Sequence, residues 1–283
     1  MAVSNSTDLN DLVGQIVYSD ALSAAYSARV MRPLVNSIQV PQGAGSIVVP
    51  QFSGVAVASL TEGTAPNSTT LASTGQTLTP VERGVYVQVS KHVLYADPFS
   101  DLAPYGEQIG RALAEDEDSQ ILALADTFAT TVGASGDVLG TAHLLSGIAA
   151  LEAANAPGPY FAVFHPTCWA GLRSAVGDAS VFASVGQKVV EGLGAGTTNL
   201  NGYVGAPYGV PCFISTQVDT TDATYQNLIF SQKAISYAYM QDIGVDVADN
   251  VPARAFDLMG WYAGHAAEQV DLYGCRILGG SSA

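Results

Sequence analysis

Residues 51–90 have the sequence QFSGVAVASLTEGTAPNSTTLASTGQTLTPVERGVYVQVS, which contains only three charged side chains. Residues 55–60 are rich in valine, and apolar residues alternate in 84–90, so both segments are predicted strands. The polar residues 61–70 between them contain too few apolar side chains to pack a core. Because an isolated hairpin is only marginally stable in water, we predict that residues 46–90 form a long two-stranded arm that lies on another surface.

Helical patterns flank this arm on both sides. On its N-terminal side, apolar residues recur at helical spacing and predict a helix from about residue 8 to Met31. A short strand over 46–49 is expected to end at Pro50. On the C-terminal side, the pattern predicts a helix over about residues 100–130, which would be about 45 Å long.

An acidic run, Glu115-Asp116-Glu117-Asp118, lies in the middle of this second helix. Asp116 follows two apolar residues by three and four positions, so it falls on the apolar stripe, where a carboxylate needs a cationic partner. We favour a structural ion pair for Asp116 over a solvated position. For the other three acids we predict a solvated face.

The second half of the chain alternates short helical and strand patterns, which is typical of a mixed α+β domain. Helices are expected over 144–154 and from Pro166 to about Ala175, because proline is favourable at the first helical position. A flexible glycine-rich loop is expected over 192–199. The predicted strands are 160–164, 210–215, 227–230, 236–239, 244–247 and 256–263.

The composition is poor in charge and acidic. Charged residues make up 12% of the 283 residues and the net charge is −15, whereas about a quarter of an ordinary soluble domain is charged. A surface with so little charge suits a subunit that hides much of itself against neighbours. Nucleic-acid binding needs clustered basic residues, and the sequence has no basic run. The acidity therefore indicates either containment of nucleic acid without tight binding or a means of staying soluble.

Motifs for catalysis, cofactors and metals are absent from the sequence. It has no HExxH, GxSxG or GxxxxGK[ST] motif, and its four histidines lack metal-ligand spacing. Cys168, Cys212 and Cys275 are odd in number and far apart, so neither a disulfide framework nor a metal site is indicated. No apolar run approaches the roughly 18 residues of a membrane span. We therefore expect no catalytic residues, no metal and no cofactor.

The order of these features resembles the major capsid proteins of tailed bacteriophages, which have the Hong Kong 97-type fold. The resemblance extends over nearly the whole chain and lies in a series of weak signals. The segments that carry it are 43–50, similar to the entry to the family's extended loop; Glu62-Gly63, similar to the loop tip; 109–122, similar to the spine helix; 161–166, similar to a strand and proline-started helix; and 273–278, similar to the closing strand.

The resemblance implies an α+β fold with an N-terminal arm, an extended β-hairpin loop, a long spine helix, and peripheral and axial domains. The implied divisions are 1–45 for the N-terminal arm, 46–90 for the extended loop, 91–135 with 240–273 for the peripheral domain, and 136–239 with 274–283 for the axial domain.

The implied function is self-assembly into an icosahedral shell that encloses double-stranded DNA without sequence-specific binding. The subunits would form hexamers and pentamers in the virion, after assembly in the bacterial cytoplasm. The short N-terminus implies a separate scaffolding protein or none, and a decoration protein is a further candidate partner. An encapsulin-like nanocompartment, a phage tail subunit and a soluble α+β hydrolase stay open as alternatives.

Scarce arginines among many acids suggest ion pairs between subunits, because a bidentate guanidinium fixes the register of two surfaces. The base of the predicted arm supplies the first candidates, Glu82 and Arg83. The full set of candidate inter-subunit contacts is Glu62, Glu82, Arg83, Asp116, Arg254 and Arg276.

Overall fold

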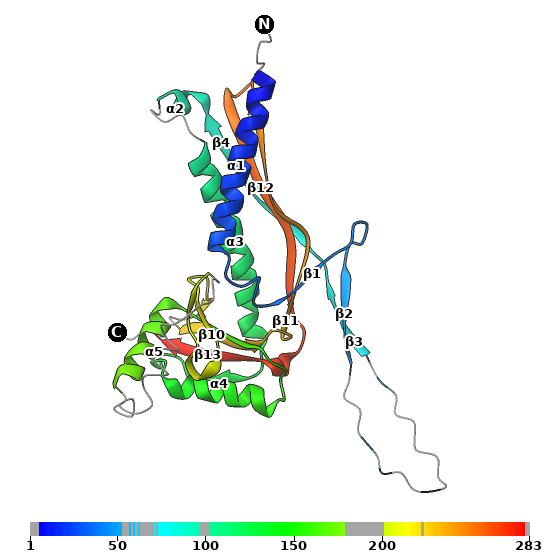
Figure 1. Ribbon diagram of the computed structural model, residues 1–283, viewed down its shortest axis with the longest axis vertical. Helices are drawn as coiled ribbons and strands as arrows, with labels where there is room; N and C mark the ends of the chain where they lie inside the picture. The colour runs from blue at the N-terminus through cyan, green and yellow to red at the C-terminus, as the bar shows by residue number, and fades with distance from the viewer. Residues whose placement is uncertain are drawn as a thin grey trace.

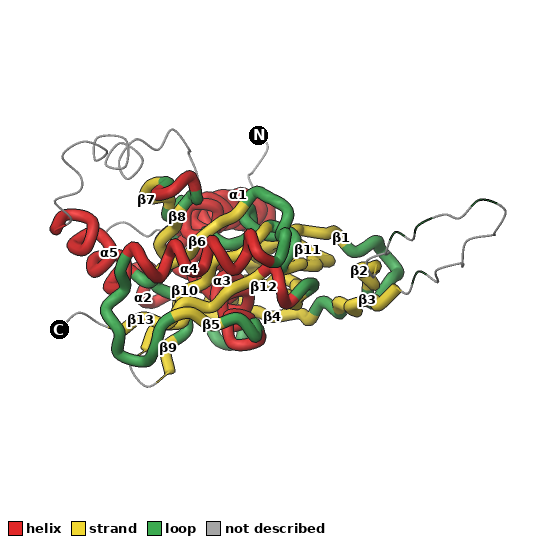
Figure 2. Tube along the Cα trace, turned by 90° about the horizontal axis from the view of Figure 1, so that it is seen from below, coloured by secondary structure: helices red, strands yellow, loops and turns green. Residues whose placement is uncertain are grey.

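The computed structural model of the chain has an elongated part, a compact part and a projecting arm (Figure 1). The arm leaves the body sideways, as the view from below also shows (Figure 2). This mixture of helices and sheets confirms the predicted α+β class. The structure describes residues 6–52, 57, 59, 62, 71, 73–96, 102–178, 201–221 and 224–280.

A four-stranded sheet of order β1-β11-β12-β4 forms the elongated part. Its long hairpin pairs β11 with β12 in antiparallel register, and β4 pairs with β12 along its whole length. Helices α1 and α3 run along the same sheet (Figure 1). The bounds are α1 Ser6–Ala28, β1 Asn36–Gln39, β4 Val81–Ser90, α2 Lys91–Ala96, α3 Ala103–Leu122, β11 Ile235–Asn250 and β12 Ala255–Glu268.

Glycines let α3 pack closely on both of its neighbours. A Cβ at Gly110 would lie 2.1 Å from the carbonyl oxygen of Ala21, so α1 lies directly against the backbone of α3. A Cβ at Gly260 of β12 would lie 2.2 Å from the side chain of Ile109 on the opposite side. Helix α3 therefore buries two faces, one under α1 and one on the sheet.

The compact part is built on a seven-stranded sheet of order β5-β13-β10-β6-β8-β7, with β9 paired to β10. Helix α4 packs on this sheet, where Gly147 lies against Ile229 and Ile277. The bounds are β5 Thr131–Val132, α4 Thr141–Ala153, β6 Tyr160–Phe164, α5 Pro166–Asp178, β7 Tyr203–Gly205, β8 Cys212–Ile214, β9 Thr220–Thr221, β10 Thr224–Ser231 and β13 Gly274–Gly280; 3₁₀ turns span Ala123–Thr127, Pro207–Gly209 and Asp271–Tyr273.

The arm consists of β2, Ile47–Phe52, paired with β3, Ser73–Leu78. The predicted pairing of 55–60 with 84–90 is therefore wrong for its second strand, because 84–90 belongs to β4 of the body sheet. There, Val89 is buried and β12 supplies a complete hydrogen-bonding partner. Most of residues 55–60 lie outside the described residues.

The first predicted strand extends further than expected. Pro50 lies inside β2, opposite Gly75, and does not end the strand. Proline is tolerated there because a strand with a single partner leaves every second backbone N–H without a ladder bond to donate.

The helix predicted over 100–130 is shorter than expected. It begins at Ala103 and ends at Leu122, where the chain continues as a 3₁₀ turn. The two strands predicted at 236–239 and 244–247 are one strand, β11, with register shifts near Gln241. The predicted strand at 160–164 and the helix that begins at Pro166 are confirmed. The expected loop at 192–199 lies outside the described residues.

Candidate functional site

The arm presents an apolar surface that no described residue of the chain covers. On β2, Val48, Pro50 and Phe52 alternate with partly or fully buried residues and share one side of the strand. Val48 is 55% and Phe52 62% exposed. We call these three residues the arm face. Exposed apolar residues on a projecting two-stranded arm suit contact with another protein surface.

The base of the arm is fixed to the body by a small apolar cluster. Val49 and Leu78 of the arm are buried with Val40, and they pack near Ala238 and Ala267 of the four-stranded sheet. The arm is therefore anchored at one end, and its two strands project beyond the body (Figure 2).

Asp116 has the cationic partner that its position predicted. Arg83 Nη1 on β4 lies 3.2 Å from Asp116 Oδ1, and the Tyr262 hydroxyl donates to Asp116 Oδ2 at 2.5 Å. Gln120 donates to both Asp116 and Tyr262. The pair is half-exposed, with 49% of the Arg83 side chain and 41% of the Asp116 side chain accessible. The ion pair is confirmed, but it joins two parts of one chain.

The solvated face predicted for Glu117 and Asp118 is wrong. Both carboxylates are buried, at 1% and 2% exposure, whereas Glu115 is exposed as expected. The prediction assumed that α3 buries only its apolar stripe. Helix α1 covers a second side of α3, and this explains why Glu117 and Asp118 are buried.

The two buried acids hold the chain where it leaves α1. Arg29 Nε lies 2.6 Å from Glu117 Oε2, and the backbone N–H groups of Val30 and Met31 donate to the two oxygens of Asp118 at 2.8 and 2.9 Å. Arg29 is itself only 7% exposed. The segment that follows α1 is therefore held by side chains from the C-terminal part of α3.

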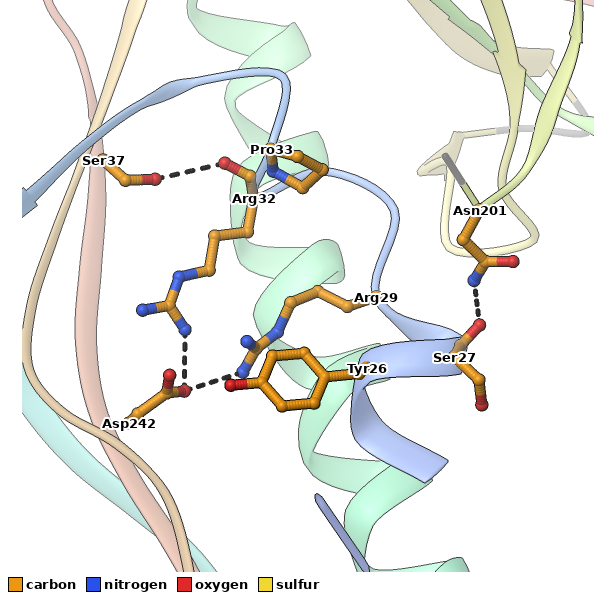
Figure 3. A pocket seen from close by; sticks show the side chains of 8 residues that line it. All are labelled: Tyr26, Ser27, Arg29, Arg32, Pro33, Ser37, Asn201 and Asp242. Atoms are coloured by element: carbon orange, nitrogen blue, oxygen red, sulfur yellow. Dashed lines mark hydrogen bonds and ion pairs between the residues drawn. The ribbon is translucent and has the colours of Figure 1, made fainter. Parts of the chain in front are cut away.

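A cleft of about 820 Å³ opens above this cluster. Arg29 and Arg32 both reach Asp242 of β11, at 3.0 and 2.7 Å, as the dashed lines in Figure 3 show. Arg32 also lies over the ring of Tyr239, with 4.2 Å between the guanidinium carbon and the ring centroid. Hydrogen bonds from Arg32 and from the Ile243 N–H outweigh partial burial and lower the pKa of Asp242.

Among the other predicted contacts, Arg276 pairs with Asp126 and bonds Thr131 within the chain. Glu62, Glu82 and Arg254 are exposed, and Arg254 has a positive φ of 48° in the turn between β11 and β12. The structure thus brings Arg83 and Asp116 together and leaves the other four apart. The inter-subunit role of all six residues stays a prediction.

Sequence reasoning missed the two features with the clearest geometry. The cluster of Arg29, Arg32, Glu117, Asp118 and Asp242 joins residues far apart in sequence, so only the acidic run and the nearby arginines could have hinted at it. The arm face had only a weak signal, because Val48, Val49 and Pro50 are consecutive and do not alternate with polar residues.

The described residues give little support to metal binding, to nucleophilic catalysis or to a membrane-spanning helix. In that part of the chain, no group of three His, Cys, Asp or Glu residues is arranged to hold a metal. Burial raises the pKa of the Cys212 and Cys275 thiols, the latter to about 11, so they are poor nucleophiles. His165 stacks on Tyr225 at the strand-to-helix turn. No described helix is long and apolar enough to cross a membrane.

A long sheet backed by two helices, a compact α+β part and an anchored projecting arm with exposed apolar residues suit a structural subunit that contacts other proteins. Residues 73–272 match the family model described as phage capsid protein. The chain therefore belongs to the phage capsid protein family, and the resemblance found in the sequence is confirmed. Membership makes it a structural protein of the virion.

Solved structures show the same fold. A structure from Mycobacterium phage Che8 is 18% identical with a TM-score of 0.67, and the match covers 88% of this chain and 90% of that one. The capsid of cyanophage P-SCSP1u is 14% identical with a TM-score of 0.67 and coverage of 90% and 89%. A virus-like particle from Pyrococcus furiosus is 12% identical with a TM-score of 0.63 and coverage of 93% and 98%. No curated protein sequence matches significantly.

Proposed function

We propose that this chain, as the major capsid protein of a tailed phage, assembles as hexamers and pentamers into an icosahedral shell. The observation that carries the proposal is the match to phage capsid proteins over residues 73–272. The exposed arm face supports it, because the free energy falls when a neighbouring subunit covers these apolar side chains. Many repeated contacts of this kind make a closed shell stable even where each is modest.

The proposed roles follow the divisions of the chain. Within residues 46–90, the predicted extended loop, β2 and β3 supply the arm that crosses a neighbour, while β4 belongs to the body sheet. Residues 1–45 supply the N-terminal arm. Residues 91–135 with 240–273 form the peripheral domain, and 136–239 with 274–283 form the axial domain near the capsomer axis. Glu62, Glu82 and Arg254 are exposed. None of the three forms a salt bridge with another described residue, so they are the predicted contacts most available to a neighbouring subunit.

The shell is proposed to contain double-stranded DNA without binding it tightly. The net charge is −15, and five of the ten basic residues, Arg29, Arg32, Arg83, Lys91 and Arg276, already pair with acids of the same chain. Few cations are left to neutralise phosphates. A separate scaffolding or decoration protein is a candidate partner, and assembly in the bacterial cytoplasm completes the proposal.

Sedimentation velocity of the purified chain tests whether it assembles. We expect fast-sedimenting closed particles of many subunits, in equilibrium with small capsomers. A single 29.2 kDa species at every concentration and in every assembly buffer would refute the proposal. Particles from infected cells should contain nuclease-protected double-stranded DNA, whereas a protein cargo would indicate a nanocompartment.

A further inference from the structure

The segment that joins α1 to β1 is held by more negative than positive charge. Two arginines, Arg29 and Arg32, face three carboxylates, Glu117, Asp118 and Asp242. With every group ionised the cluster carries one net negative charge. Three of its members are almost fully buried, and an uncompensated charge in such a place is costly. One bound proton would remove that charge.

Asp118 is the member best placed to take the proton. Among the described residues it forms no salt bridge, and it accepts hydrogen bonds from two backbone N–H groups, those of Val30 and Met31. A carboxylate so buried is destabilised relative to its acid form. Burial raises the pKa of Asp118 to about 7, although the two N–H donors act in the opposite direction. When α1 leaves and water enters, the pKa should return toward its ordinary value.

Burial also raises the pKa of Glu117, but Glu117 pairs with Arg29 and Arg32, which favour its ionised form. Glu117, on the same helix, raises the pKa of Asp118, and Arg29 lowers it. Tyr237 of β11 has a pKa raised by burial, so it stays neutral near pH 7. Arg111 and Glu115 of α3 line the cleft on the Asp118 side and have opposite charges.

We propose that residues 29–32 form a proton-dependent latch, in which protonation at Asp118 strengthens the docking of α1 on α3 and deprotonation weakens it. The sign follows from linkage, because the docked state binds the proton more tightly than the open state. The stabilisation is complete below pH 3.8, the ordinary pKa, and is lost as the pH rises through about 7. Docking should therefore be tighter at pH 6 than at pH 8.

The latch lies at the C-terminal end of α1, which is also tied to the body by the hydrogen bond that Asn201 donates to the Ser27 carbonyl oxygen. Along the contact between α1 and α3, Val17 lies against Gly106 and the backbone of Ala21 lies against Gly110. The inference concerns one chain and stands whether or not the proposed DNA-filled shell is correct.

Hydrogen exchange of the full chain tests the latch. Exchange rates of amides in residues 15–35, corrected for the intrinsic effect of pH, would be compared at pH 6 and pH 8, with β10 as an internal reference. A one-proton link with a pKa near 7 predicts up to about tenfold more protection at pH 6. Asp118→Asn should remove this difference, and Glu115→Gln, a neutralised acid on the exposed side of the same helix, should retain it.

Asp118→Ser is a second neutral variant, smaller but still able to accept a hydrogen bond, in case the amide prevents folding. Loss of the pH dependence in either variant, with retention in Glu115→Gln, supports the latch. The proposal fails if wild-type protection is equal at the two pH values or greater at pH 8. It also fails if the folded Asp118 variants keep the tenfold difference.

Discussion

Replacing Arg29 with methionine should destabilise the fold by about 3–5 kcal/mol, the usual cost of removing one partner from a buried ion pair. Methionine fills much of the same space but leaves Glu117, which is 1% exposed, without its 2.6 Å partner. Arg32 is 3.5 Å from the other carboxylate oxygen and compensates only in part. Chemical denaturation of the unassembled chain measures the free energy of unfolding directly.

The matched control is Arg83→Met. Its pair with Asp116 is about half-exposed on both sides, so the expected loss is about 1 kcal/mol or less. The double variant Arg29→Met with Glu117→Leu should regain much of the stability, because a well-packed apolar pair can replace a buried ion pair. Equal losses for Arg29→Met and Arg83→Met would show that burial does not determine the contribution of these pairs.

Placing aspartates on the arm face, with Val48→Asp and Phe52→Asp together, should abolish assembly and leave the fold intact. Both side chains are more than half exposed in the single chain, so their replacement costs little within it. In a shell, each carboxylate would be buried against a neighbour without a partner, at a cost of several kcal/mol per contact. Sedimentation velocity would report the assembly, and circular dichroism the fold.

Thr74→Asp is the control for charge alone. Thr74 of β3 pairs with Gln51 of β2, so its side chain lies on the other side of the arm from Val48 and Phe52. Shells should form when only this residue is changed. If the double variant assembles normally, or if Thr74→Asp is equally disruptive, the arm face is not the specific contact that we propose.

Local signals predicted much of the fold. Proline at position 166 and the buried run at 160–164 fixed a strand and a helix correctly, because both depend on residues close in sequence. The partner of each strand was harder to predict. Residues 84–90 alternate as a hairpin strand would, but the 14-residue strand β12, more than 160 residues later, offered a longer and better-packed ladder.

The candidate site shows the same division. Asp116 was correctly assigned an ion pair from its place on an apolar stripe. Glu117 and Asp118 were wrongly assigned to solvent, because the stripe rule treats a helix as having one buried face. Only the docking of α1 on Gly106 and Gly110 gives α3 a second one. Contacts between subunits depend on surfaces that a single chain cannot define, so those residues stay predictions.

Electron microscopy of the purified, assembled particles tests the central claim most directly. We predict closed icosahedral shells whose reconstructed density places the arm formed by β2 and β3 across a neighbouring subunit, with Val48 and Phe52 covered. Open tubes, or shells in which the arm contacts only its own chain, would contradict the account.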